Sequence, residues 1–252
     1  MLILHKYGFL SYFCKKNALK IMGKDILFEF IGTAVLILFG SGVCANVNLK
    51  NTLGNKSGWI VITIGWGLAV FVAAFISAPY SGAHLNPAVT IGLTVAGSFD
   101  GNVIGYIIAQ LLGAIVGACL MFTMYKPHFD AEENPNTKLG VFCTGPAIKS
   151  LFSNFMSEVI GTFALIFGIL MVGGAQIAGP LPVSLLIVAI GMALGGTTGY
   201  AINPARDLGP RIAHFILPFK GKRDSNWGYA WLPVVAPIVG CVLAALLYVV
   251  LT

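Results

Sequence analysis

The sequence predicts an all-α polytopic membrane protein with six transmembrane helices and two short re-entrant half-helices, arranged as an inverted three-plus-three repeat. The first observation is composition: 57% of the 252 residues are hydrophobic and 10% are charged, whereas soluble domains carry about 25% charged residues. The second is a pattern around Asn-Pro-Ala that occurs once in each half of the chain. The third is a set of further short matches in the same order in both halves.

The Asn-Pro-Ala pattern occupies residues 81–90 and 198–207. Asn is a favoured helix N-cap and Pro a favoured first helical residue, so each triplet predicts the start of a helix. About ten mostly apolar residues follow each triplet, half of the ~20 that a membrane-spanning helix needs. Two short capped helices in matching positions indicate a site at the membrane midplane. Its predicted constriction consists of Asn86, Pro87, Ala88, Asn203, Pro204 and Ala205.

The first half is predicted to contain three spans and one re-entrant segment. Glu29 lies in the first turns of the first span, and Trp66 lies in the second span. The re-entrant segment, residues 79–102, ends at a polar turn, and the polar stretch 126–150 is predicted to be the loop that joins the halves. The predicted spans are residues 26–47, 59–78 and 103–125.

The second half repeats this order. Glu158 lies at the start of its first span, and its re-entrant segment ends at the basic turn 220–224. The predicted spans are residues 154–175, 181–197 and 229–251. We therefore expect one channel domain over residues 25–252, with repeat one at about 25–125 and repeat two at about 151–252.

Short matches elsewhere support the repeat. Residues 29–33 and 158–162 share the pattern Glu-x-Ile-Gly-Thr, and residues 109–113 and 236–240 share Ala-x-x-x-Gly. Chance similarity between apolar helices explains any one match, but not three in the same order. Because three spans per half is an odd number, the second half enters the membrane from the opposite side, which makes the repeat inverted.

Residues 1–24 are predicted to be a cytoplasmic N-terminal segment. Their five lysines are scattered among apolar residues, unlike a signal peptide, in which charge precedes an uninterrupted apolar core; a true start at Met22 is the alternative. Charge before the first span favours a cytoplasmic N-terminus. The positive-inside count opposes this orientation, because it places outside the cations Lys50, Lys56, Lys126, Lys138, Lys149, Lys220, Lys222 and Arg223.

Other chemistry is not indicated. The five cysteines include no Cys-x-x-Cys pair, and the four histidines show no metal-ligand spacing, so the sequence predicts no catalytic residue, metal or cofactor. The net charge of +6 comes from cations scattered over the termini and loops. This pattern is typical of charge that flanks a lipid bilayer and does not indicate nucleic-acid binding.

The residues before each Asn-Pro-Ala triplet are predicted to be unwound. Unwound backbone at membrane depth occurs where it is buried or lines a water-filled cavity, so its carbonyls are expected to form two ladders of acceptors. Glu29 and Glu158 are costly to bury in spans, and each is predicted to bind backbone N–H groups of its half's loop; a proton relay is the alternative. The predicted ladder residues are Gly82, Ala83, His84, Leu85, Gly199, Tyr200, Ala201 and Ile202.

These motifs resemble the aquaporin, or major intrinsic protein, family over roughly residues 25–251. The resemblance rests on both Asn-Pro-Ala boxes, on Ser-Gly-Ala-His-Leu before the first and on Arg206-Asp207 after the second. It implies an hourglass fold with half-helices meeting at Pro87 and Pro204, a homotetramer with one pore per subunit, and a place in the cell (inner or plasma) membrane. Asp207 and the long third loop are typical of the glycerol facilitator branch.

The resemblance assigns a selectivity filter to Trp66, Gly191, Tyr200 and Arg206. Water-selective relatives usually carry His at the position of Gly191, and Gly there leaves room for a carbon chain. Trp66 and Tyr200 would face the carbons of glycerol, while the five fixed donors of Arg206 would face its hydroxyls. A facilitator of the family has Phe where this chain has Tyr200, so the Tyr hydroxyl would trim the aperture.

The implied function is a passive channel for glycerol and similar small polyols, with some water conduction and with ions and protons excluded. Asn86 and Asn203 would donate amide hydrogens to the passing oxygen, and the half-helix N-termini would repel cations. A mainly water-selective channel is the alternative if Tyr200 narrows the filter. An ion-coupled secondary transporter is a further alternative, but such a transporter would need an ionisable group at the midplane, and Asn86 and Asn203 are not ionisable. An enzyme is not indicated.

Overall fold

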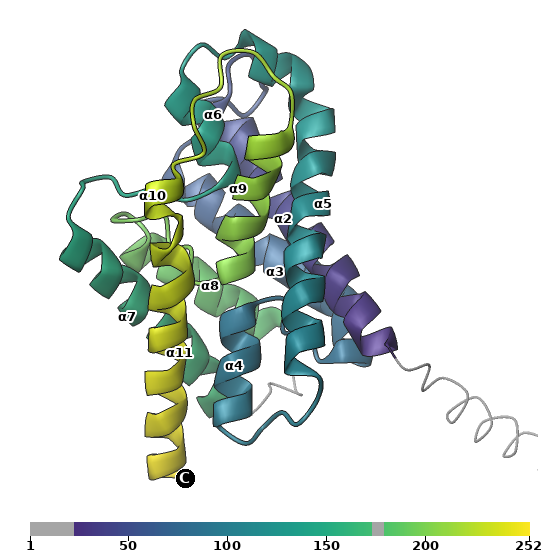
Figure 1. Cartoon of the computed structure of the whole chain (residues 1–252), viewed down its shortest axis with the longest axis vertical. Helices are drawn as coiled ribbons and strands as arrows, with labels where there is room; N and C mark the ends of the chain where they lie inside the picture. Colours follow the sequence, from purple (N-terminus) through teal and green to yellow (C-terminus); the bar gives the residue numbers. More distant parts are fainter. Residues whose placement is uncertain (1–22, 173–178) are drawn as a thin grey trace, which may run out of the picture.

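The computed structural model describes residues 23–172 and 179–252, in which all regular structure is helical (Figure 1). The helices of the first half are α2 (Lys24–Asn48), α3 (Trp59–Ser81), α4 (Pro87–Val95) and α5 (Val103–Ala131). After α6 (Pro135–Phe142), the second half contains α7 (Leu151–Met171), α8 (Leu181–Leu194), α9 (Pro204–Ile216), α10 (Trp227–Ala230) and α11 (Leu232–Leu251). Most of the predicted segment 1–24 and the end of the predicted span 154–175 lie outside the described residues.

The lengths and compositions of these helices suit a membrane bundle. The described residues contain five helical stretches that are long and apolar enough to cross a bilayer: α2, α3, α5, α7 and the stretch Trp227–Leu251. The sixth span, α8, is equally apolar but has 14 residues, or about 21 Å at ~1.5 Å per residue. It ends before the predicted residue 197 because two consecutive glycines, Gly195 and Gly196, follow it. The half-helices α4 and α9 have 9 and 13 residues.

The predicted ends of α3 and α5 are wrong by a few residues. The sequence predicts that these helices end at residues 78 and 125, yet each continues past a proline, Pro79 in α3 and Pro127 in α5. In α5 the reason is burial: Phe129, two residues past the proline, is fully buried against other phenylalanine rings. The stretch 126–150 is therefore not a single loop, because it begins as helix and contains α6.

Each half is held together internally by an equivalent close contact between two of its long helices. α5 packs against α2 at Gly113 and Gly117, where an added Cβ would overlap the backbone oxygens of Phe30 and Ala34. α11 packs against α7 in the same way at Gly240. Small residues allow such close approach of helix backbones in a membrane, where van der Waals packing drives association. These glycines therefore serve packing within the subunit.

Each half-helix packs against the opposite half of the chain. α9 lies against α5, and α4 lies against α11, so that α9 and α4 stand one above the other between those two long helices (Figure 1). Gly209 permits the first of these contacts, since an added Cβ would lie 2.5 Å from the side chain of Ala114. Because each half-helix packs against the opposite half, the N-termini of both half-helices lie at the centre of the bundle.

Candidate pore and filter

A cavity of about 540 Å³ lies where the two half-helices begin. The unwound segments and the filter supply its polar lining, and the long helices supply its aliphatic lining. The segments and filter contribute Trp66, Gly82, Ala83, His84, Leu85, Asn86, Tyr200, Ala201, Ile202, Asn203 and Arg206. The aliphatic residues include Leu36, Val70, Ala74, Leu93, Leu165, Ile169, Val183 and Ile187. The cavity therefore presents polar and apolar surface side by side.

Asn86 and Asn203 both line the cavity, and the side chain of each bonds to the unwound segment of the opposite half. The side-chain oxygen of each accepts a backbone N–H of the helix that it begins. The side-chain nitrogen of Asn86 donates to the Ile202 carbonyl, and that of Asn203 donates to the Leu85 carbonyl, both at 2.9 Å. Because an amide nitrogen has two hydrogens, one remains on each residue for the cavity. The neighbouring residues Pro87, Ala88, Pro204 and Ala205 are buried in the first turns of α4 and α9.

The unwound segments 82–85 and 199–202 share one backbone pattern, with positive φ at their first, second and fourth residues. The angles are 81°, 55° and 53° at Gly82, Ala83 and Leu85, and 84°, 40° and 42° at Gly199, Tyr200 and Ile202. Positive φ at a residue other than Gly costs about 1–3 kcal/mol. In the described residues, the first three carbonyls of each segment accept no backbone hydrogen bond. These six oxygens are therefore left as acceptors.

Glu29 and Glu158 are fully buried and hold the unwound segments in this conformation. Glu158 accepts hydrogen bonds from two backbone N–H groups of its segment, at 2.9 and 2.8 Å, and from the hydroxyl of Thr198 at 2.6 Å. Glu29 accepts the three equivalent bonds in the first half and a fourth, at 2.7 Å, from Gln110. Charge-assisted bonds of this kind are worth about 1.5–3 kcal/mol each, enough to offset the strain of the segments.

Arg206 and Trp66 form one part of the cavity wall. The guanidinium carbon of Arg206 lies 4.0 Å from the centre of the Trp66 ring, which is a cation–π arrangement. Both side chains are largely buried and still line the cavity. Asp207, the next residue of α9, bonds elsewhere, because adjacent helical side chains do not share a face.

Tyr200 occupies the space beside Gly191. A Cβ added at Gly191 would lie 2.9 Å from Cζ and 3.0 Å from the hydroxyl oxygen of Tyr200. The edge of the ring meets Trp59, whose indole nitrogen donates to the Gly191 carbonyl at 3.1 Å. The Tyr200 hydroxyl is buried, and in the described part of the chain it has no hydrogen-bond partner. The structure thus brings Trp66, Tyr200 and Arg206 to the cavity wall and places Gly191 behind Tyr200.

Asp207 belongs to a buried network that the sequence analysis did not predict. Its carboxylate accepts the backbone N–H of Thr144 at 2.8 Å and the Thr144 hydroxyl at 2.6 Å, and it pairs with Arg211 at 2.7 Å. Arg211 is fully buried and also donates to the carbonyls of Thr144 and Ser225. The spacing of four residues between Asp207 and Arg211 was the available signal. Nothing in the sequence indicates that Thr144 joins them.

Comparisons with known proteins agree with this architecture. The family model described as Major intrinsic protein matches residues 17–248. The glycerol uptake facilitator protein of Bacillus subtilis is 56% identical over 216 residues, which cover 84% of this chain and 79% of that protein. A probable glycerol uptake facilitator protein of Thermotoga maritima is 54% identical over 226 residues, covering 88% and 97%. The X-ray structure of the aquaglyceroporin from Plasmodium falciparum has a TM-score of 0.78 at 37% identity, covering 89% of this chain and 94% of that one.

Proposed function

The chain belongs to the major intrinsic protein family, and from this premise we propose that it is a passive membrane channel for glycerol and similar small uncharged solutes. Relatives of more than 50% identity over most of the chain are named as glycerol uptake facilitators. The protein is a multi-pass membrane protein and not an enzyme. Channels of this kind conduct down a gradient, so no cofactor or coupling ion takes part.

The observation that supports the proposal best is the mixed lining of the cavity. Glycerol has one edge of three hydroxyls and one edge of carbon-bound hydrogens. The unpaired carbonyls of segments 82–85 and 199–202 would accept hydrogen bonds from the hydroxyls, while the aliphatic residues and the rings of Trp66 and Tyr200 would contact the carbon edge. A cavity of this composition replaces the hydration shell of an amphipathic solute without requiring a charged group.

Exclusion of ions and protons follows from the groups at the centre. The free amide hydrogens of Asn86 and Asn203 would donate to each passing oxygen, which interrupts a hydrogen-bonded chain along which protons could move. The N-termini of α4 and α9 place the positive ends of two helix dipoles at the same point. Arg206 adds a full positive charge in the filter. In the described residues, the buried carboxylates of Glu29 and Glu158 are occupied by loop donors, which leaves no free midplane carboxylate for ion coupling.

The proposal includes the arrangement in the membrane. Residues 25–252 form one channel domain of two repeats, and four identical chains associate, each with its own pore. The channel lies in the cell membrane, with the N-terminus in the cytoplasm, and conducts some water beside glycerol. The five lysines of residues 1–24 support this orientation.

Stopped-flow light scattering on proteoliposomes tests the function directly. Glycerol entry well above that of empty vesicles, with water permeability also raised, is the expected result. Fast water movement with background glycerol entry would instead favour the water-selective alternative, in which Tyr200 narrows the filter too far for glycerol. Glycerol uptake that requires an imposed ion gradient would refute passive conduction.

A further inference from the structure

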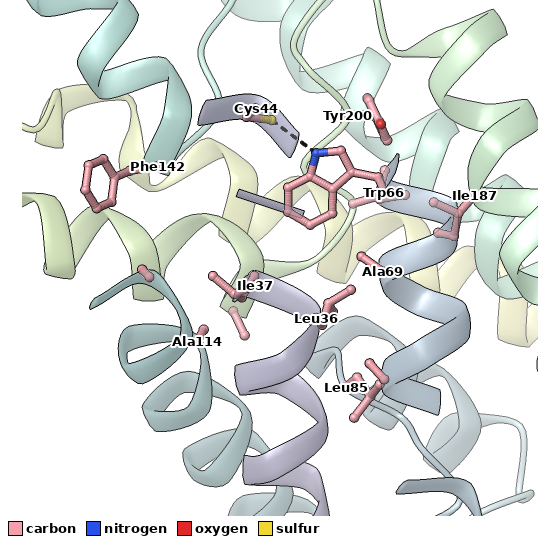
Figure 2. Packing of buried hydrophobic residues seen from close by; sticks show 14 of the residues in the cluster. Leu36, Ile37, Cys44, Trp66, Ala69, Leu85, Ala114, Phe142, Ile187 and Tyr200 are labelled. Atoms are coloured by element: carbon pink, nitrogen blue, oxygen red, sulfur yellow. Dashed lines mark hydrogen bonds between the residues drawn. The ribbon is translucent and has the colours of Figure 1, made fainter. Parts of the chain in front are cut away.

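Three residues hold the indole of Trp66 in place, and two of them belong to α2. Its nitrogen donates a hydrogen bond to the sulfur of Cys44 at 3.3 Å, the contact drawn as a dashed line in Figure 2. Gly40, one turn earlier on α2, leaves the space in which the six-membered ring lies, since an added Cβ would overlap three of the ring carbons. Arg206 covers the ring face at 4.0 Å. The indole is 4% exposed, so these contacts define its position.

The hydrogen bond to Cys44 decides which edge of the indole faces the cavity. Indole has one N–H donor and no acceptor, and in the described residues this N–H bonds to the sulfur on α2. With the N–H paired to Cys44, the indole presents no free donor to the cavity that Trp66 lines. Without this acceptor the N–H would turn toward the carbonyls or the solute in the cavity, because a buried donor is costly to leave unpaired.

We propose that Gly40 and Cys44 are positioning residues of the filter, which fix the indole of Trp66 and thereby set the ratio of glycerol to water permeability. Neither residue lines the cavity, and both act through Trp66. The proposal rests on the proposed function, since it concerns the same filter. It assigns to the buried thiol of Cys44 a role that requires a hydrogen-bond acceptor, whereas a thiol that only filled space would be replaceable by any small apolar residue.

Substitution of Cys44 separates these two roles. Cys44→Ala removes the acceptor, and we expect the ratio of glycerol to water permeability to fall about 3- to 10-fold, the equivalent of one lost hydrogen bond. Cys44→Ser keeps an acceptor oxygen and should restore most of the ratio. Cys119→Ala makes the same change at a partly buried thiol of α5 and should leave the ratio unchanged. Equal ratios in the wild type and Cys44→Ala would overturn the proposal.

Gly40 and Gly42 of α2 give a second, independent comparison. Gly40→Ala would push the indole toward the cavity, so glycerol permeability should fall at least about 10-fold and water permeability less. Gly42→Ala places the same methyl group two residues away, where nothing lies within 4 Å of it, and should behave as wild type. Equal losses of glycerol and water in Gly40→Ala would show that the helix packing had failed, not that the filter had narrowed, and would count against the proposal.

A spectroscopic readout distinguishes failure of this inference from failure of the proposed function. Ultraviolet resonance Raman spectra report the hydrogen bonding of indole N–H groups, and the chain has four tryptophans. The difference spectrum of wild type and Cys44→Ala should show one indole losing its acceptor, and Cys119→Ala should show no difference. If wild-type vesicles admit no glycerol, the proposed function fails while this spectrum still tests the contact. If glycerol enters and neither spectrum nor ratio changes in Cys44→Ala, only the inference fails.

Discussion

Gly191 offers a strict test of the filter, because the structure shows what a side chain there would meet. In Gly191→Ala the new methyl carbon would lie 2.9 Å from Cζ and 3.0 Å from the hydroxyl oxygen of Tyr200, whereas ordinary contact begins at 3.4 Å. The phenol ring must therefore move by about 0.5 Å. Its other sides are confined, because Trp59 packs against it edge-on and a Cβ added at Gly195 would overlap its Cδ1, while Cγ2 of Thr63 lies 3.0 Å from the new methyl. The direction left to it is the cavity that it lines.

The expected size of the effect follows from the cost of overpacking. Adding a methyl group to a packed site costs about 1–3 kcal/mol. If the ring shift transfers about 1.4 kcal/mol of that to the barrier for glycerol, glycerol permeability falls ~10-fold. Water, which is smaller, should lose less. Removing the hydroxyl in Gly191→Ala/Tyr200→Phe relieves the 3.0 Å contact but not the 2.9 Å contact, so it should restore glycerol permeability only in part.

The assay is stopped-flow light scattering with equal amounts of protein per vesicle, measuring glycerol and water in the same preparation. Gly196→Ala is the matched control, since it adds the same methyl group five residues later at an exposed position with nothing within 4 Å. An equal loss of glycerol and water permeability in Gly191→Ala, or no loss of either, would refute the filter geometry described here.

Three further predictions follow from buried groups. Tyr200→Phe should keep the wild-type ratio of glycerol to water permeability and raise the free energy of unfolding by about 1–3 kcal/mol, because the hydroxyl is buried without a partner in the described residues. A lower ratio of glycerol to water permeability would mean that the hydroxyl contacts the solute. Glu158→Gln should lower the free energy of unfolding by about 1–3 kcal/mol, since one amide N–H would face a backbone N–H of the loop. Thermal unfolding in detergent measures this change, and unchanged stability would mean that Glu158 does not hold segment 199–202 in its unwound conformation. Arg206→Ala should admit protons or cations, measured as decay of a pH or potassium gradient across vesicles. Conductance at the wild-type level would mean that the helix dipoles and Asn86 with Asn203 suffice.

The parts of the fold that the sequence predicts are those encoded locally or by repetition. Asn86 and Asn203 are N-caps, and N-capping depends on residues two or three positions away. The six spans follow from composition because a bilayer demands apolar length. The four-residue spacing of Gly113 and Gly117 places both on one face of α5 and indicates a close helix contact, but it does not identify α2 as the partner.

The features that escaped prediction depend on distant side chains. α5 continues past Pro127 because Phe129 is buried against α6 and the segment after α9, and those partners are not visible from the neighbouring sequence. The contact of Tyr200 with Gly191 joins residues on either side of a turn, and its geometry depends on the positive φ of Tyr200. Whether Gly191 leaves open space or holds a ring cannot be decided from residue type alone.

The packing of α4 against α11 also has a consequence for how the protein is made. α4 (Pro87–Val95) is synthesised early, whereas the helix that covers it, α11 (Leu232–Leu251), is synthesised much later. Until then the carbonyls of segment 82–85 have no enclosed place in the bilayer, where unsatisfied backbone is excluded. We therefore expect the half-helix α4 to stay outside the lipid core until α11 has been made. Assembly should finish in one late, concerted step, in which both half-helices enter the bundle. In this step Asn86 would bond to the Ile202 carbonyl and Asn203 to the Leu85 carbonyl.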